Sequence, residues 1–208
     1  MTQRLISSAT PLLLGSGSPR RRDLLRDLGI PTLVRATSAP EDLWPGDTVP
    51  VFLDRVVRAK FEAAVELGRA LPHAGVLVAD TIVVLDGDIL GKPADVEDAG
   101  RLLHRLCGRT HSVWTCYALA HAGQAPVLRA VETRVSLRSA TSEEISDYAN
   151  TGEGLDKAGA YAAQGLGVFL VERIDGSYTN VVGLPATEVI ADLCRLGLVE
   201  RFPLGGSR

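Results

Sequence analysis

The order of strand-like and helix-like segments is the strongest constraint on the fold of this chain. Short apolar runs at Pro11–Leu14 and Thr32–Arg35 alternate with helical segments at Pro19–Leu28 and Pro50–Leu67, and a longer apolar run follows at Val76–Leu85. Strands separated by helices are typical of α/β proteins. With 208 residues, 46% of them hydrophobic, the chain is long enough to bury a large core.

Turn and cap signals extend this α/β pattern along the chain. Asp86-Gly87 stands between two apolar runs and predicts a hairpin, so at least one strand pair is antiparallel and the sheet is mixed. No internal repeat or linker interrupts the pattern, and we predict a single domain over residues 1–208. The other predicted elements are helices at Asp95–Leu106, from the capping box at Thr141 to Gly152 and at Pro185–Arg195, and strands at His111–Ala122, Val127–Leu137 and Val168–Ile174.

Charge and hydropathy exclude several classes of partner. A formal net charge of −3 gives no general attraction to nucleic acid or to an anionic membrane, so we expect neither as a partner. The apolar run before the first glycine, Pro11–Leu14, is too short for a signal peptide or a membrane helix. We therefore expect a cytoplasmic protein, and the sequence also allows a homodimer.

The segment from Gly15 to Arg22 joins the first strand to the first helix through a turn suited to an anion. Small residues let backbone N–H groups approach a ligand, Ser18 is a good N-cap and Pro19 a good first helical residue. Three arginines in succession then follow at the positive end of the helix dipole, where cations are unfavourable unless an anion binds. The turn predicts a phosphate site, and the alternative is a solvated, arginine-rich helix start.

Two acids are candidates for chemistry. Asp80 interrupts an apolar strand, so its carboxylate is either a structural hydrogen-bond acceptor or a group that binds a metal and activates water. Glu41 lies in a loop and could supply a second carboxylate to a divalent cation, with Asp42 as a competing choice.

Neutral and basic residues add further candidates. Gln164 lies among small residues, and its amide could read the edge of a base or could belong to an ordinary turn. Of the 22 basic residues 19 are arginine, and the three lysines, Lys60, Lys92 and Lys157, are candidates for positions that need a compact ammonium. We interpret His111 as structural.

Seven short motifs, in this order and spacing, make the chain similar to the Maf family of nucleoside triphosphate pyrophosphatases. The resemblance runs from about Leu12 to about Cys194. The motifs are Gly15-Ser16-Gly17-Ser18-Pro19-Arg20-Arg21, Ala79-Asp80-Thr81, Gly91-Lys92-Pro93, Gly108-Arg109-Thr110-His111, Lys157-Ala158-Gly159-Ala160-Tyr161, Gln164-Gly165-Leu166-Gly167 and Val182-Gly183-Leu184-Pro185.

The resemblance implies a twisted mixed sheet flanked by helices, with two lobes around a central nucleotide-binding cleft. It also implies hydrolysis of a nucleoside triphosphate between its α and β phosphates, with Mg²⁺ or Mn²⁺ as cofactor. Asp80 would activate water and share the metal with Glu41. Residues matching the family's substrate-binding positions are Arg20, Thr81 and Gln164, associated with substrate choice, and Ser16, Ser18, Arg21, Lys60 and Lys92, which line the cleft.

Gln164 points to a subgroup within the family. The branch with glutamine at this position acts on dTTP and UTP, whereas the branch with glutamate acts on 7-methyl-GTP, and we favour the former. The open alternatives are a pyrophosphatase for modified nucleotides and a nucleotide-binding regulator of cell division with little turnover. Departures from the family pattern are Gly15 and Cys107, which are conservative changes, and the Trp44-Pro45 pair beside Glu41. Of these, only the Trp44-Pro45 loop could alter nucleotide preference.

Overall fold

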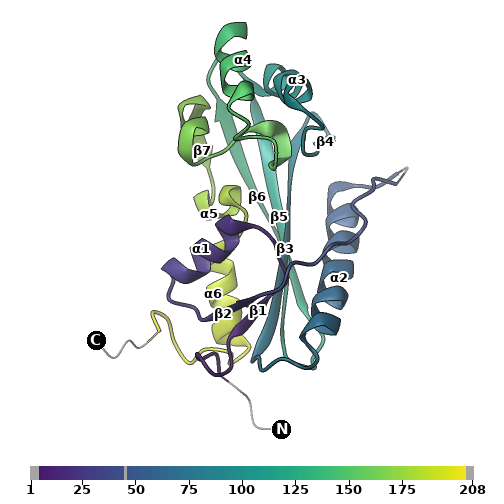
Figure 1. Cartoon of the computed structure of the whole chain (residues 1–208), viewed down its shortest axis with the longest axis vertical. Coiled ribbons are helices and arrows are strands. Elements are labelled where there is room, and N and C mark those ends of the chain that lie inside the picture. Colours follow the sequence, from purple (N-terminus) through teal and green to yellow (C-terminus); the bar gives the residue numbers. More distant parts are fainter. Residues whose placement is uncertain (1–4, 45, 205–208) are drawn as a thin grey trace. The chain divides into compact units, whose positions relative to one another are not determined.

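The computed structural model describes residues 5–44 and 46–204, and it shows an α/β protein with a mixed sheet flanked by helices (Figure 1). Within these residues the sheet has seven strands in the order β2-β1-β3-β5-β6-β7, with β4 paired to β3. β1 is parallel to β2 and β3, whereas β3–β4 and β6–β7 are antiparallel. The predicted mixed sheet is therefore confirmed.

The strands are β1 (Leu12–Leu14), β2 (Thr32–Val34), β3 (Gly75–Leu85), β4 (Asp88–Leu90), β5 (Thr110–His121), β6 (Val127–Leu137) and β7 (Val171–Asp175). The helices are α1 (Pro19–Asp27), α2 (Val49–Gly68), α3 (Val96–Leu106), α4 (Ser142–Asn150), α5 (Tyr178–Val182) and α6 (Ala186–Arg195), and the short 3₁₀ segments are η1 (Ala158–Ala160) and η2 (Gly165–Leu170).

The chain forms two compact units. The first unit contains the residues up to Asp80, Cys116–Ala130 and the residues from Gly183 onward. The second unit contains Thr81–Thr115 and Val131–Val182. Strands β3, β5 and β6 each contribute residues to both units.

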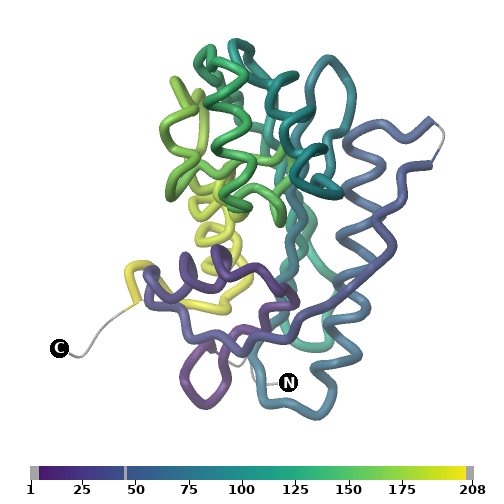
Figure 2. The backbone as a smooth tube through the Cα atoms, turned by 45° about the horizontal axis from the view of Figure 1, so that its top comes forward, coloured from purple at the N-terminus to yellow at the C-terminus, as the bar shows by residue number. Residues whose placement is uncertain are grey.

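In the first unit, helices cover both faces of the parallel strands. Leu12 and Leu14 of β1 are buried with Leu193 of α6 and side chains of α1, because alternate residues of a strand face opposite sides. Leu13 faces α2, where a Cβ at Gly68 would lie 2.4 Å from its side chain. Figure 1 accordingly shows α1 and α6 on one side of β1 and α2 on the other. In Figure 2 α1 and α6, from opposite ends of the sequence, again lie together.

In the second unit, α3 and α4 pack beside each other over a core that includes Leu103 and Tyr148 (Figure 1). Their N-termini follow the predicted signals, since Asp95 accepts a hydrogen bond from Asp98 N and Thr141 opens a complete capping box. The hairpin is also confirmed, with positive φ angles of 54° at Asp86 and 90° at Gly87.

The segment from Gly165 to Asp175 differs from the sequence prediction. An apolar strand was expected over Val168–Ile174, but residues 165–170 form the 3₁₀ segment η2 and the strand β7 covers Val171–Asp175. Val168 and Phe169 are exposed, so this apolar run is not the signature of a buried strand. The short helix α5 was not predicted either.

No helix in the described part of the chain is both long and apolar enough to cross a bilayer.

His111 is buried in the core of the second unit, as its structural interpretation implies, and its Nε2 lies 2.8 Å from the Tyr161 hydroxyl. Burial lowers its pKa from 6.5 to about 4. The unfolded chain therefore takes up a proton more readily than the folded one. The stability that neutral His111 contributes is fully present above pH 6.5 and is lost as the pH falls toward 4.

We expect acid to reduce the free energy of unfolding by about 3 kcal/mol through this one residue. His111→Phe should remove most of that loss. Urea unfolding of the whole chain at neutral and acidic pH measures this free energy in both proteins. An equal acid-dependent loss in the variant would show that other groups cause the effect.

Candidate active site

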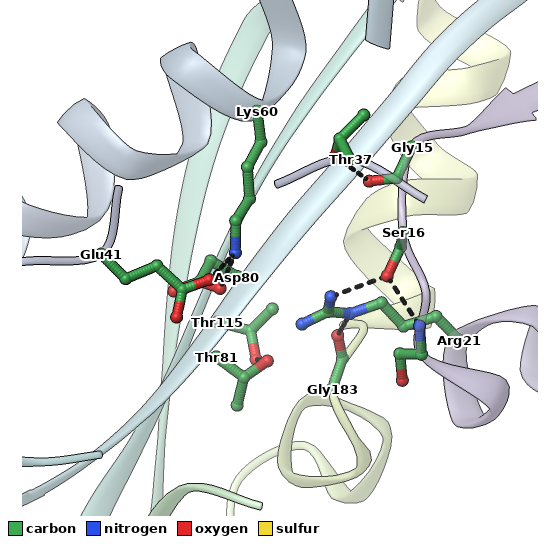
Figure 3. Close-up of polar contacts among 11 residues, drawn as sticks. Gly15, Ser16, Arg21, Thr37, Glu41, Lys60, Asp80, Thr81, Thr115 and Gly183 are labelled. Carbon is green, nitrogen blue, oxygen red and sulfur yellow. Dashed lines mark hydrogen bonds and ion pairs between the residues drawn. The ribbon is translucent and has the colours of Figure 1, made fainter. Parts of the chain in front are cut away.

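The turn between β1 and α1 is held together by Ser16 and Arg21 (Figure 3). The buried hydroxyl of Ser16 accepts hydrogen bonds from Arg21 Nη1 at 3.0 Å and from the backbone N–H of Ser18 at 3.2 Å. Arg21 Nε also donates to the carbonyl oxygen of Gly183 at 2.8 Å. A Cβ at Gly15 would lie 2.6 Å from the Cβ of Ala64, so the turn requires glycine where it passes α2.

Ser18 and the arginines at the start of α1 have different surroundings. Ser18 occupies the N-cap position and α1 begins at Pro19, so the predicted helix start is confirmed, although the Ser18 side chain makes no cap hydrogen bond. Ser16 binds the Ser18 N–H instead. Arg22 is exposed and pairs with Asp23, which is the solvated arrangement left open as the alternative. Arg20 is half-buried and repels Arg21 electrostatically.

Arg21 carries its charge into the interior of the first unit. Burial lowers the pKa of its guanidinium, while Asp80 and, more weakly, Glu41 raise it. A guanidinium stays protonated despite such shifts. The turn therefore holds a fixed positive charge that interacts with the two candidate acids.

Glu41 and Asp80 converge on the ammonium of Lys60 (Figure 3). Lys60 Nζ, from the middle of α2, donates to Glu41 Oε1 and to Asp80 Oδ1, each at 2.6 Å. Lys60 and Asp80 are each 8% exposed, whereas the Glu41 side chain is 47% exposed. The carboxylate that interrupts strand β3 thus has a partner, as a buried charge requires.

The loop that carries Glu41 is fastened to α2 by Arg55. Arg55 Nη2 donates to the carbonyl oxygen of Asp42 at 2.9 Å and to the Asp47 carboxylate at 2.6 Å, and the guanidinium lies 3.9 Å from the centre of the Trp44 ring. Glu41, rather than Asp42, is therefore the acid that contacts Lys60. Trp44 supports the loop, while Pro45 lies outside the described residues.

Glu41 and Asp80 are the residues suited to a divalent cation. Two carboxylates that share one ammonium are close enough to share a cation, and Mg²⁺ takes one or two carboxylates with substrate phosphate oxygens. No cluster of three or more His, Cys, Asp or Glu residues with metal-binding geometry occurs among the residues described. A cation here would therefore depend on phosphate oxygens for further ligands.

The remaining predicted substrate-binding residues, Thr81, Lys92 and Gln164, belong to the second unit. The Thr81 hydroxyl lies 2.8 Å from that of Thr115, which donates to the carbonyl oxygen of Asn180 at 3.0 Å. Lys92 is exposed just after β4. Gln164 is exposed at the N-cap of η2. The structure fixes Thr81 by hydrogen bonds and places Lys92 and Gln164 at the surface of their unit.

Comparison with known proteins identifies the family. Residues 11–196 match a family model described as Maf-like protein. The chain belongs to the Maf family. It is 49% identical to the dTTP/UTP pyrophosphatase of Myxococcus xanthus, over 91% of this chain and 94% of that protein. It is 46% identical to the dTTP/UTP pyrophosphatase of Geobacter sulfurreducens, over 89% of this chain and 96% of that protein.

A likeness to solved structures is more distant. The Staphylococcus aureus Ham1 protein superposes with a TM-score of 0.41 and 15% identity, over 61% of this chain and 71% of that one. The family assignment rests on the family model and the sequence relatives.

Two residues that hold site side chains in this Maf chain were not among the predicted site residues. Gly183 was named only as part of a matched motif, yet its carbonyl oxygen orients Arg21. Thr115 lies in an apolar strand and carries no motif, yet it orients Thr81. For Gly183, membership in a matched motif was the one sequence signal that pointed to the site. No sequence signal pointed to Thr115.

Proposed function

We propose that this Maf chain hydrolyses nucleoside triphosphates, dTTP and UTP above others, to the monophosphate and pyrophosphate. The observation that carries the proposal is the convergence of Glu41 and Asp80 on Lys60, in the same unit as the Ser16–Arg21 turn. Acids alone would repel a triphosphate, and the turn alone would only bind one. Together they supply both phosphate binding and a base.

Phosphate binding is assigned to the basic and hydroxyl residues. Arg21 is held by Ser16 and Gly183 before any ligand arrives, so little is lost in ordering it when a phosphate binds. The positive end of the α1 dipole favours an anion at the same turn. The full proposed substrate-binding set is Ser16, Ser18, Arg20, Arg21, Lys60, Thr81, Lys92 and Gln164.

Asp80 is the proposed general base. It accepts a proton from water while the water oxygen forms a bond to the α phosphorus, and the bond to the bridging oxygen breaks with its electron pair leaving on pyrophosphate. The ammonium of Lys60 balances the negative charge of the Asp80 carboxylate that accepts this proton. Arg21 and Lys60 would neutralise the charge of the leaving pyrophosphate.

Glu41 and Asp80 would hold the divalent cation, Mg²⁺ or Mn²⁺. When bound, such a cation withdraws charge from phosphate oxygens as a Lewis acid. The exposed side chain of Glu41 leaves this carboxylate able to turn from Lys60 toward a ligand. The single-domain organisation, a homodimer and a cytoplasmic location remain predictions from the sequence.

Gln164 is the proposed base-selecting residue. Its amide offers both a donor and an acceptor, which a pyrimidine's carbonyl and N–H require, whereas a carboxylate suits a cationic methylated guanine. The similarity to dTTP/UTP pyrophosphatases over most of the chain supports the pyrimidine preference.

Gln164→Glu should lower kcat/KM for dTTP by about 10- to 100-fold, since one mismatched polar contact costs about 1–3 kcal/mol. Pyrophosphate release from dTTP, UTP, CTP and 7-methyl-GTP with Mg²⁺ measures it. Gln124→Glu is the matched control, because it makes the same change at an exposed turn. A wild-type preference for 7-methyl-GTP would contradict the pyrimidine assignment, and tight binding without turnover would favour the regulator.

A further inference from the structure

The loop that presents Gln164 is fastened on both sides by two side chains. On the N-terminal side, the backbone N–H of Ala162 donates to the Tyr148 hydroxyl at 3.1 Å. On the C-terminal side, the N–H groups of Leu166 and Gly167 donate to the two carboxylate oxygens of Glu153, at 2.8 and 2.7 Å. Gln164 is exposed at the tip between these anchors.

The two anchoring side chains are hydrogen-bonded to each other. The Tyr148 hydroxyl donates to Glu153 Oε2 at 2.8 Å, so one hydrogen-bonded chain joins the two sides of the loop. Tyr148 is buried against α3 and the core, and Lys157 Nζ donates to the carbonyl oxygen of Glu153. Partial burial acts to raise the pKa of Glu153, but hydrogen bonds from Leu166, Tyr148 and Gly167 outweigh it and lower the pKa. Glu153 therefore stays an anion that accepts bonds on both oxygens.

The glycines on either side of Leu166 fit this arrangement. Gly165 has a φ of +69°, and a Cβ there would lie 2.2 Å from Glu153 Oε1. A Cβ at Gly167 would lie 2.5 Å from the Tyr148 hydroxyl. Any side chain at either position would push the loop away from its anchors, so the Gln-Gly-Leu-Gly sequence and the Glu153–Tyr148 pair depend on each other.

We propose that Glu153 and Tyr148 are positioning residues for base selection, because they fix the loop on which Gln164 meets a pyrimidine. The inference rests on the proposed function and deepens it. Neither residue needs to touch the nucleotide. Their effect reaches the substrate through Gln164, and it should therefore depend on the glutamine being present.

Glu153→Gln tests this directly. A neutral amide offers one acceptor oxygen in place of two, so one of the two N–H bonds is lost. We expect the preference for dTTP over 7-methyl-GTP to fall about tenfold, the cost of roughly one hydrogen bond, mainly through a higher KM for dTTP. Tyr148→Phe keeps the buried ring and removes both hydroxyl bonds, so it should move the preference in the same direction. Glu143→Gln, at an exposed position at the start of α4, is the control.

A double-mutant cycle separates positioning from a general structural role. In a Gln164→Ala background, Glu153→Gln should leave kcat/KM for dTTP changed by less than about twofold, because the residue positioned is gone. A loss of equal size in both backgrounds would overturn the proposal. If Glu153→Gln does not fold, the same cycle is run with Tyr148→Phe.

Amide hydrogen exchange gives a readout that needs no activity. The Leu166 and Gly167 amides should exchange faster in Glu153→Gln than in the wild type, and unchanged exchange would overturn the proposal. A wild-type chain that released no pyrophosphate from any nucleotide would overturn both the proposed function and this inference. An active wild type whose base preference is the same in Glu153→Gln and Tyr148→Phe would overturn the inference alone.

Discussion

Asp80→Asn is expected to lower kcat for dTTP hydrolysis about a thousandfold with little change in KM, because an amide cannot accept the proton of the attacking water. The side chain keeps nearly the same size and can still accept a hydrogen bond from Lys60, so the fold should be preserved. Pyrophosphate release at saturating dTTP with Mg²⁺ measures the change.

Asp54→Asn is the matched control for this variant. Asp54 lies on α2 in the same unit, is half-exposed and pairs with Arg58 at the surface. Its substitution should leave kcat within about twofold of the wild type, since surface ion pairs contribute little. A folded Asp80→Asn protein with near-normal kcat would remove Asp80 from the chemistry and leave it as a structural partner of Lys60.

Lys60→Met should reduce the free energy of unfolding by about 3 kcal/mol, because it leaves the buried Asp80 carboxylate beside Glu41 with no ammonium between them. The half-exposed position of Glu41 keeps the loss at the low end for a broken buried pair. The same change should give Mg²⁺ a larger stabilising effect on the variant than on the wild type, since a cation that binds only the folded chain stabilises it.

Urea unfolding with and without Mg²⁺ measures both effects of Lys60→Met. Arg58→Met, two residues earlier on the same helix, removes an exposed cation and serves as the control. A loss no greater than that of the control, or an equal response to Mg²⁺ in variant and wild type, would show that the two carboxylates do not form one cation site.

Local signals in the sequence predicted much of the fold. The strand-turn-helix at Gly15, the Asp86-Gly87 hairpin and the caps at Asp95 and Thr141 each depend on residues within a few positions of one another. Such signals act through backbone conformation and short-range hydrogen bonds, so they can be read from the sequence without knowledge of the tertiary packing. The strand prediction over Val168–Ile174 was wrong in its first part because the four apolar residues Val168–Val171 fit a 3₁₀ segment and a strand equally well.

The site was predicted as a set of residues, but not as a set of contacts. Composition marked Lys60 as unusual, and an apolar strand marked Asp80, yet nothing in their spacing of 20 positions says that they form an ion pair. Arg21 and Gly183 are 162 positions apart, and only the packing of α6 beside α1 brings them together. Long-range contacts of this kind depend on tertiary packing, which periodicity and motif spacing do not predict.

The contacts that hold the loop at Gln164 could not be predicted from the sequence either. Its sequence indicated small residues around one amide, which is compatible with a base-reading loop or with an ordinary turn. The structure shows why the neighbours must be glycine, because the Glu153 carboxylate and the Tyr148 hydroxyl occupy the space where their side chains would lie. That explanation needs the positions of residues on two other segments, which no local pattern contains.

The most direct test of the central claim is to identify the products of dTTP hydrolysis by ³¹P NMR in ¹⁸O-enriched water, with Mg²⁺ and the wild-type chain. Attack by a water activated at Asp80 on the α phosphorus predicts dTMP carrying the ¹⁸O label and unlabelled pyrophosphate. Release of dTDP and inorganic phosphate, or label in the pyrophosphate, would contradict it.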